Sequence, residues 1–203
     1  MAINNELSLA MFNASQDVYN KGTTGFVQQF GYKLDQSFGG FGTGFYIDET
    51  TGFSVVAFES IDNPKEKILA FAGTEGLQDA YADLNLGWVQ WTGNGGKNRE
   101  AIIDNYLSLL PADAIINFAG HSLGGALAQY AMYDYVDDVI NAQRKDVPNI
   151  TLTTFNGLGG ETALAQNFET LSGRAFDLEL VAQVQNNSII RNYRTDGDLV
   201  SRL

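Results

Sequence analysis

A serine flanked by small residues is the first candidate for chemistry in this sequence. Gly120-His-Ser122-Leu-Gly124 fits the pattern G-x-S-x-G, in which a sharp turn from a strand into a helix pushes a serine hydroxyl into a cleft. Glycines flank the serine because a Cβ at either place would collide in so tight a turn. The pattern predicts that Ser122 is a nucleophile, and a plain tight turn in an α/β core is the alternative.

The residues on both sides of Ser122 suit such a turn. Residues 114–119 are mostly apolar and predict a short strand, while Ala126 to Val136 have the apolar spacing of a helix. A strand, a turn and a helix in this order are the context that a nucleophilic serine of this type requires. The flanking residues therefore support the prediction that Ser122 is a nucleophile.

The base that such a serine needs is harder to find. A serine hydroxyl must lose its proton to a base, which in sites of this type is a histidine held by a carboxylate. The chain has one histidine, His121, directly before Ser122. Adjacent side chains in the turn point to different sides of the backbone, so the imidazole is not expected to reach the serine hydroxyl. We expect it to pack beside the turn and to bond to neighbouring backbone.

The carboxylate that would hold the base has three candidates. In folds of this kind the acid follows a strand that comes after the nucleophile. Asp198 lies just past a predicted last strand at 188–194, in the turn Asp196-Gly-Asp198. Asp198 is the first choice, Asp196 is its rival, and Asp177 is a weaker candidate. For each of them, a solvated turn residue is the alternative.

An oxyanion forms during acyl transfer, and it needs two hydrogen-bond donors already in place. One is expected to be the backbone N–H of Leu123, and the second should come from the loop after an earlier strand. Thr74, at the end of Phe71-Ala-Gly-Thr74, fits that place with both an amide and a hydroxyl. A residue that merely ends a strand is the alternative for Thr74.

The remaining pattern predicts one α/β domain over residues 1–203, with a mixed, mostly parallel sheet flanked by helices and antiparallel strands at one edge. Residues 22–44 are rich in glycine and aromatics and show no clear period. Helices are predicted at 5–20, 79–86, 97–110, 126–136 and 161–168, and strands at 41–48, 53–60, 67–73, 114–119, 149–155 and 188–194.

Composition removes several classes of protein from consideration. The net charge of −12 argues against nucleic acid or an anionic membrane as an electrostatic partner. The chain has no cysteine and one histidine, so we expect no disulfide, thiol nucleophile, metal cluster or other cofactor. No segment approaches the roughly 18 apolar residues of a membrane span, and the first residues lack the pattern of a signal peptide.

At these residues the chain resembles the class 3 lipases, α/β hydrolases that act on acylglycerols and phospholipids. In that family the block at Phe71-Ala-Gly-Thr74 supplies an oxyanion donor, the block at Gly120-His-Ser-Leu-Gly-Gly125 supplies the nucleophile, and the block that begins at Asp198 supplies the catalytic aspartate. The resemblance covers about residues 67–203 and rests on four blocks: Phe71-Ala-Gly-Thr74 with Ala82-Asp-Leu84, Gly120-His-Ser-Leu-Gly-Gly125, Thr153-Thr-Phe-Asn-Gly157, and Asp198-Leu-Val-Ser-Arg-Leu203.

The resemblance implies a serine carboxylic-ester hydrolase, lipase-like or phospholipase-like, that forms an acyl-enzyme. Ser122 would be the nucleophile, Asp198 the acid, and Thr74 and Leu123 the oxyanion donors. An acyl ester or lipid is the implied substrate, and peripheral contact with a lipid interface follows from it. In that family, residues 75–82 would belong to a lid over the site or lie near it, but here the segment is short and only weakly apolar, which argues against interfacial activation.

The chain departs from the family because the family's C-terminal histidine is missing. We expect that residues 1–203 are an incomplete domain whose histidine lies beyond Leu203, as part of a longer protein. By analogy, acidic, cysteine-free hydrolase domains resemble modules of large secreted bacterial proteins. A hydrolase-fold module that binds lipid or a partner without turnover is the alternative, and acyl transfer instead of hydrolysis is a third hypothesis.

Overall fold

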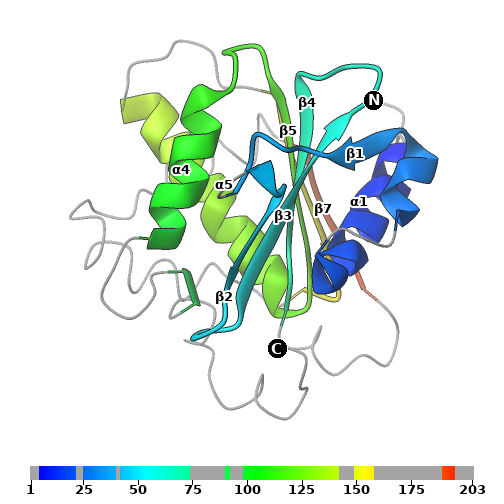
Figure 1. Cartoon of the computed structure of the whole chain (residues 1–203), viewed down its shortest axis with the longest axis horizontal. Coiled ribbons are helices and arrows are strands. Elements are labelled where there is room, and N and C mark those ends of the chain that lie inside the picture. Colours follow the sequence, from blue (N-terminus) through cyan, green and yellow to red (C-terminus); the bar gives the residue numbers. More distant parts are fainter. Residues whose placement is uncertain are drawn as a thin grey trace.

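A single mixed sheet organises the chain. The computed structural model describes residues 5–21, 25–39, 42–73, 90–91, 98–141, 149–157 and 189–194. These residues form a seven-stranded sheet in the order β1-β3-β4-β5-β6-β7, with β2 also paired to β3, and helices cover both faces (Figure 1). The fold class predicted from the sequence, α/β with antiparallel strands at one edge, is therefore confirmed.

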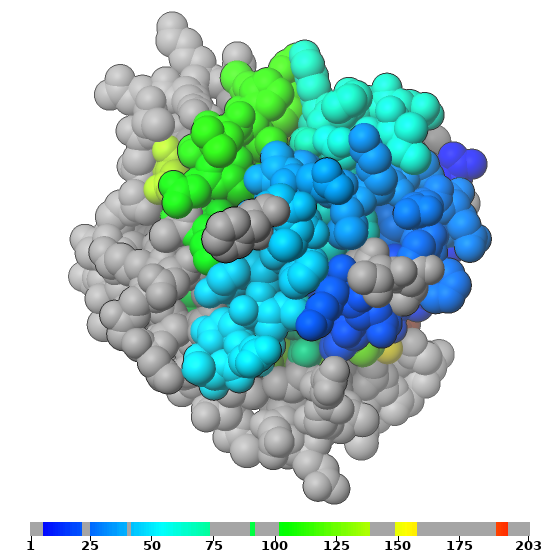
Figure 2. Space-filling view, in the orientation of Figure 1, coloured from blue at the N-terminus to red at the C-terminus, as the bar shows by residue number. Residues whose placement is uncertain are grey.

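The antiparallel part of the sheet begins with two short strands that share one neighbour. β1 pairs with residues 58–60 of β3, and β2 pairs with residues 53–56 of the same strand. In the space-filling view this edge lies between the green surface of α4 (Asn98–Leu109) and the blue surface of the N-terminal residues (Figure 2). The strands are β1 (Tyr32–Leu34), β2 (Phe45–Asp48), β3 (Phe53–Ser60) and β4 (Glu66–Phe71).

The parallel part of the sheet places four carboxyl ends in one row. β4 is followed by β5 (Ile115–His121), β6 (Asn149–Phe155) and β7 (Ile189–Tyr193), all parallel. In the register, His121 is opposite Phe155, and Phe155 is opposite Tyr193. Ligands of open α/β sheets bind outside the carboxyl ends of such strands, so this row is where a site is expected.

Each face of the sheet has its own apolar core. The helix α1 (Asn5–Asp17) covers one face, whereas α4 (Asn98–Leu109) and α5 (Leu123–Asn141) cover the other (Figure 1). Met11 and Ala14 of α1, and Val18 directly after it, are buried in the core on their face of the sheet. Two short 3-10 helices, η1 (Val18–Asn20) and η2 (Phe26–Phe30), follow α1.

Some sequence-based expectations need correction or lie outside this description. Part of the segment 22–44 is ordered as η2 and β1, which the sequence pattern did not predict. Trp91 packs in the core against Phe53 and Phe71. The predicted helices 79–86 and 161–168 lie outside the described residues. No helix within the described ranges is long and apolar enough to cross a membrane.

A buried ion pair ties β1, β4 and α4 together. Asp35 directly follows β1, and its carboxylate lies 2.6 Å from Nζ of Lys67 on β4. Tyr106 of α4 donates a hydrogen bond of 2.7 Å to the same carboxylate, and Ser37 donates two more. Burial raises the pKa of Asp35, but these hydrogen bonds outweigh it and lower the pKa to about 2.

The lowered pKa of Asp35 predicts a loss of stability in acid. The unfolded chain has a pKa near 3.9 for aspartate, so the contribution of Asp35 is fully present above about pH 4 and is lost as the pH falls towards 2. A pKa shift of this size corresponds to roughly 2–3 kcal/mol of unfolding free energy. Urea unfolding between pH 5 and 2 should show this decrease. An equal slope in a variant without the Asp35 carboxylate would contradict the assignment.

Candidate active site

Ser122 lies at the tip of a strained turn between β5 and α5. Its φ is +55°, a left-handed conformation that costs a residue with a side chain about 1 kcal/mol or more. The turn is held because the N–H of Ser122 donates to the carbonyl of Phe155 (3.1 Å), and its own carbonyl accepts from Gly125 (2.9 Å). The strand, turn and helix predicted around Ser122 are thus present, and the residue is 7% exposed.

Three glycines let the backbone close around this turn. A Cβ at Gly120 would collide with the carbonyl group of Gly124, and a Cβ at Gly124 would collide with the carbonyl oxygen of Phe71 on β4. A Cβ at Gly125 would lie 2.8 Å from Cα of Gly157. Real Cβ atoms do not approach this closely, so the glycines are needed for the contact of the turn with both neighbouring strands.

Replacing Gly124 with alanine is therefore expected to cost about 3 kcal/mol of unfolding free energy, because the new methyl group forces the turn away from β4. Gly31→Ala is the matched control. Its φ of +79° strains alanine by roughly 1–2 kcal/mol, but nothing lies within 4 Å of the added Cβ. Urea unfolding measures both variants. If Gly124→Ala loses no more unfolding free energy than Gly31→Ala, the turn can move away from β4 without destabilising the protein.

The segment after β4 passes directly beside the start of α5. A Cβ at Gly73 would lie 2.8 Å from the carbonyl oxygen of His121 and 3.1 Å from the backbone nitrogen of Leu123. Leu123 is the first residue of α5, and the first N–H groups of a helix have no partner within the helix. The structure thus brings together Ser122, the N–H of Leu123 and the chain leading to Thr74.

Tyr19, which sequence analysis did not single out, holds the segment after β4 in place next to the turn of Ser122. It does so from the side of the sheet that α1 covers. Its hydroxyl accepts a hydrogen bond from the N–H of Gly73 (3.0 Å) and lies 3.3 Å from Nδ1 of His121. The sequence analysis expected His121 to bond to neighbouring backbone, and the structure places its ring against this tyrosine. No local pattern signals the contact, because Tyr19 is 54 and 102 residues from its two partners.

Tyr19→Phe should loosen the segment after β4. The change leaves the N–H of Gly73 without its acceptor and should cost about 1–2 kcal/mol. The exchange rate of the Gly73 amide, measured by NMR, should rise by roughly five- to thirtyfold, which is the factor that corresponds to this free energy. Tyr46→Phe on β2, at the antiparallel edge, is the control and should leave that rate unchanged. Unchanged exchange in Tyr19→Phe would mean that the hydroxyl does not hold Gly73.

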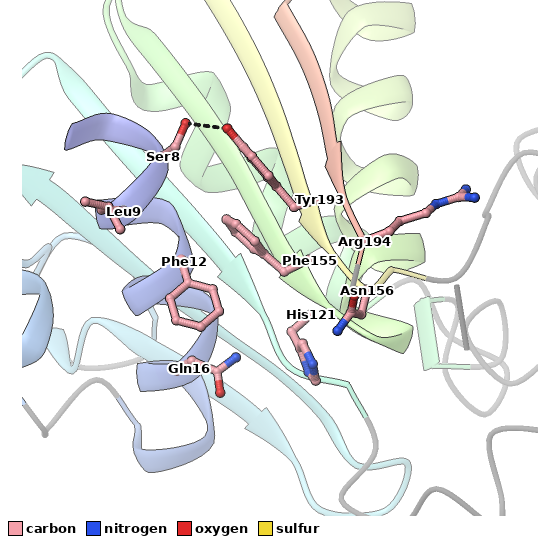
Figure 3. A pocket seen from close by; sticks show the side chains of 9 residues that line it. All are labelled: Ser8, Leu9, Phe12, Gln16, His121, Phe155, Asn156, Tyr193 and Arg194. Atoms are coloured by element: carbon pink, nitrogen blue, oxygen red, sulfur yellow. Dashed lines mark hydrogen bonds between the residues drawn. The ribbon is translucent and has the colours of Figure 1, made fainter. Parts of the chain in front are cut away.

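His121 also lines a pocket of about 700 Å³ between α1 and the ends of β6 and β7 (Figure 3). The neighbouring residues Phe155 and Asn156, at the end of β6, line it too. Nine of the described side chains line it, and Ser122 is not one of them. The imidazole of His121 therefore lies on the side of the turn that faces α1.

The predicted site residues fall into two groups. Ser122 and Leu123 are described, and they occupy the turn and the helix start that the sequence predicted. Thr74, Asp198 and the rival acids Asp196 and Asp177 lie outside the described residues, so their roles stay predictions. In the part of the chain that the structure describes, no group of three or more His, Cys, Asp or Glu side chains could hold a metal ion.

A solved lipase shares this fold. It is a triacylglycerol lipase from Penicillium expansum, with a TM-score of 0.58 and 16% sequence identity over 94% of this chain and 68% of the lipase chain. At this identity the likeness concerns the fold alone. No protein-family model matches the sequence, and no curated protein has a significant match to it.

Proposed function

We propose that the chain is the core of a serine carboxylic-ester hydrolase, lipase-like or phospholipase-like, with Ser122 as its nucleophile. The observation that carries this proposal is the strained φ of +55° at Ser122, at the carboxyl ends of the parallel strands. Backbone strain of this kind persists only where the surrounding structure imposes it, and it is concentrated at functional sites. The strand-to-helix turn around it matches the setting of a hydrolase serine.

In the proposed reaction, Oγ of Ser122 attacks the carbonyl carbon of the ester as its proton passes to a base. The negative charge that forms on the carbonyl oxygen is stabilised by the N–H of Leu123 and by Thr74. The C–O bond of the ester then breaks, the alcohol leaves with the proton, and the acyl group stays on Ser122. Water releases the acid by the reverse sequence, and Asp198 orients the base throughout.

In this proposal, the 203 residues supply the nucleophile, the oxyanion donors and the acid of the active site, but not the base. His121 is the only histidine of the sequence, and its ring is in contact with Tyr19 on the side of the turn facing α1. We therefore infer that the base belongs to polypeptide outside these residues. This inference rests on the position of His121, and it predicts that activity depends on the natural flanking sequence.

Active-site labelling tests the proposal. The protein is prepared both as these 203 residues and with its natural flanking sequence, and each is treated with a fluorophosphonate probe and with p-nitrophenyl esters of two to twelve carbons. Phosphonylation mapped to Ser122 by mass spectrometry, together with ester hydrolysis, is the expected result. If neither form is labelled at Ser122 or hydrolyses any ester, the proposal is wrong.

A hydrolase-fold module without turnover is the second candidate, and the position of His121 favours it. It predicts that no histidine comes within hydrogen-bond distance of Ser122 in any form of the protein. Acyl transfer to an alcohol is a variant of the first candidate, since the same acyl-enzyme can be resolved by an alcohol instead of water. Product analysis with added alcohol separates transfer from hydrolysis.

A further inference from the structure

The pocket between α1 and the strand ends has walls that are mostly apolar. Phe12 packs edge-to-face on Phe155 with ring centroids 5.1 Å apart, and Phe155 stacks on Tyr193 at 5.3 Å. Leu9 lies one helical turn from Phe12 on the same helix (Figure 3). With a volume of about 700 Å³, the pocket lies in the size range of small-molecule sites.

Apolar exposure is concentrated at this pocket. Among the described residues six large apolar side chains are exposed, and three of them line it: Leu9 (50% exposed), Phe12 (42%) and Tyr193 (41%). Exposed apolar side chains that cluster around a concave site mark a binding surface, whereas scattered ones need no explanation. The aromatic walls thus offer contact area for an alkyl chain.

The charges at the pocket differ from those of the chain as a whole. The sequence has 24 acidic and 12 basic residues, yet none of the nine lining residues that the structure describes is acidic. Its one arginine, Arg194, extends its guanidinium outwards past the rim, and the polar groups of Gln16, His121 and Asn156 lie together at one end (Figure 3). Amide and imidazole N–H groups donate hydrogen bonds, so this end suits a head group with acceptor oxygens.

We propose that this pocket binds a monomeric single-chain amphiphile with an anionic oxygen head, namely the carboxylate of a medium-chain fatty acid. The alkyl chain lies against Leu9, Phe12 and Phe155, and the carboxylate faces the end formed by Gln16, His121 and Asn156. The site adjoins the turn of Ser122 through His121 but does not require Ser122 to be a nucleophile. It is therefore a binding site in addition to the proposed esterase centre.

Binding of two amphiphiles with the same alkyl chain tests the charge preference. Laurate and dodecyltrimethylammonium, each below its micelle concentration, are titrated calorimetrically into the full chain. Non-specific attraction to a protein with a net charge of −12 favours the cation. We expect laurate to saturate one site and to bind at least tenfold more tightly than the cation. No binding of laurate, or equal or tighter binding of the cation, overturns the proposal.

Two matched leucine variants test the location. Leu9→Glu places a carboxylate at the pocket, whereas Leu109→Glu makes the same change at an 82% exposed position of α4. Leu9→Glu should weaken laurate binding at least tenfold, and Leu109→Glu should leave it within twofold. If Leu9→Glu does not fold, Phe12→Ser is compared with Phe26→Ser, a control that is 53% exposed on η2. Equal effects within the pair would overturn the proposed site.

Laurate binding also separates this proposal from the esterase proposal. Ser122→Ala should bind laurate as the unchanged chain does, because Ser122 does not line the pocket. Laurate binding without ester hydrolysis in either form of the protein, with or without the natural flanking sequence, would support the pocket and reject the esterase. Ester hydrolysis without laurate binding at the pocket lined by Leu9 would support the esterase and reject the pocket.

Discussion

In the form with the natural flanking sequence, replacing Ser122 with alanine is expected to lower ester hydrolysis by roughly 10⁴-fold or more, because the proposed acyl-enzyme can no longer form. The loss should appear in kcat, with little change in KM, since the hydroxyl contributes to the transition state more than to substrate binding. The variant should fold normally, because alanine removes one oxygen at a position whose N–H and carbonyl make the hydrogen bonds of the turn. Steady-state kinetics with a p-nitrophenyl ester measures the change.

Ser108→Ala is the matched control for this experiment. Ser108 is exposed on α4, and its hydroxyl donates only a local hydrogen bond of 2.9 Å to the carbonyl of Asn105. The same atom is removed, so activity should stay within twofold. Activity within tenfold of the unchanged protein in Ser122→Ala would remove Ser122 from the mechanism.

The largest expected effect on stability comes from Asp35→Ala. The side chains of Asp35 and Lys67 are 4% and 7% exposed, and removing one member of a buried ion pair costs about 3–5 kcal/mol because the other charge stays buried. Lys67 keeps a second partner in Glu59 at 2.8 Å, which places the expected loss near the lower end of this range. Urea unfolding at pH 7 measures it.

Asp113→Ala provides the control, because it removes the same carboxylate from another lysine pair. Asp113 lies 2.5 Å from Lys65, but these side chains are 67% and 54% exposed. Surface pairs of this kind contribute little to stability, because water and salt screen the two charges. Similar losses in the two variants would mean that burial of the Asp35 pair does not determine its contribution.

Strong local patterns allowed much of the sheet to be predicted. The strands at 53–60 and 149–155 have the predicted bounds, because each is a run of β-branched and aromatic residues ended by turn residues. β1 was missed because it has only three residues and forms by pairing with β3. The partner of Leu34 is Phe58, which lies 24 positions later in the sequence. Pairing of so short a strand depends on tertiary contacts that no local pattern reveals.

The same distinction applies to the candidate site. The turn at Ser122 was predicted because its glycines stand within five residues of one another, and the structure shows the contact that each one permits. Tyr19 was missed because its contacts with Gly73 and His121 are created by packing α1 on the sheet. Thr74 and Asp198 stay predictions, since they lie outside the described residues.

The division of the outer edge of β3 between β1 and β2 has a consequence for self-association. The two short strands change over at Ala57, whose carbonyl accepts from Asp35 and whose N–H donates to Gly44. A foreign strand at this edge would find at most four consecutive strand residues, because the chain leaves the edge after Asp35 and returns to it at Gly44. Edge-to-edge pairing is favoured by a long, flat strand edge, so the interruption at Ala57 disfavours the addition of a further strand at this side.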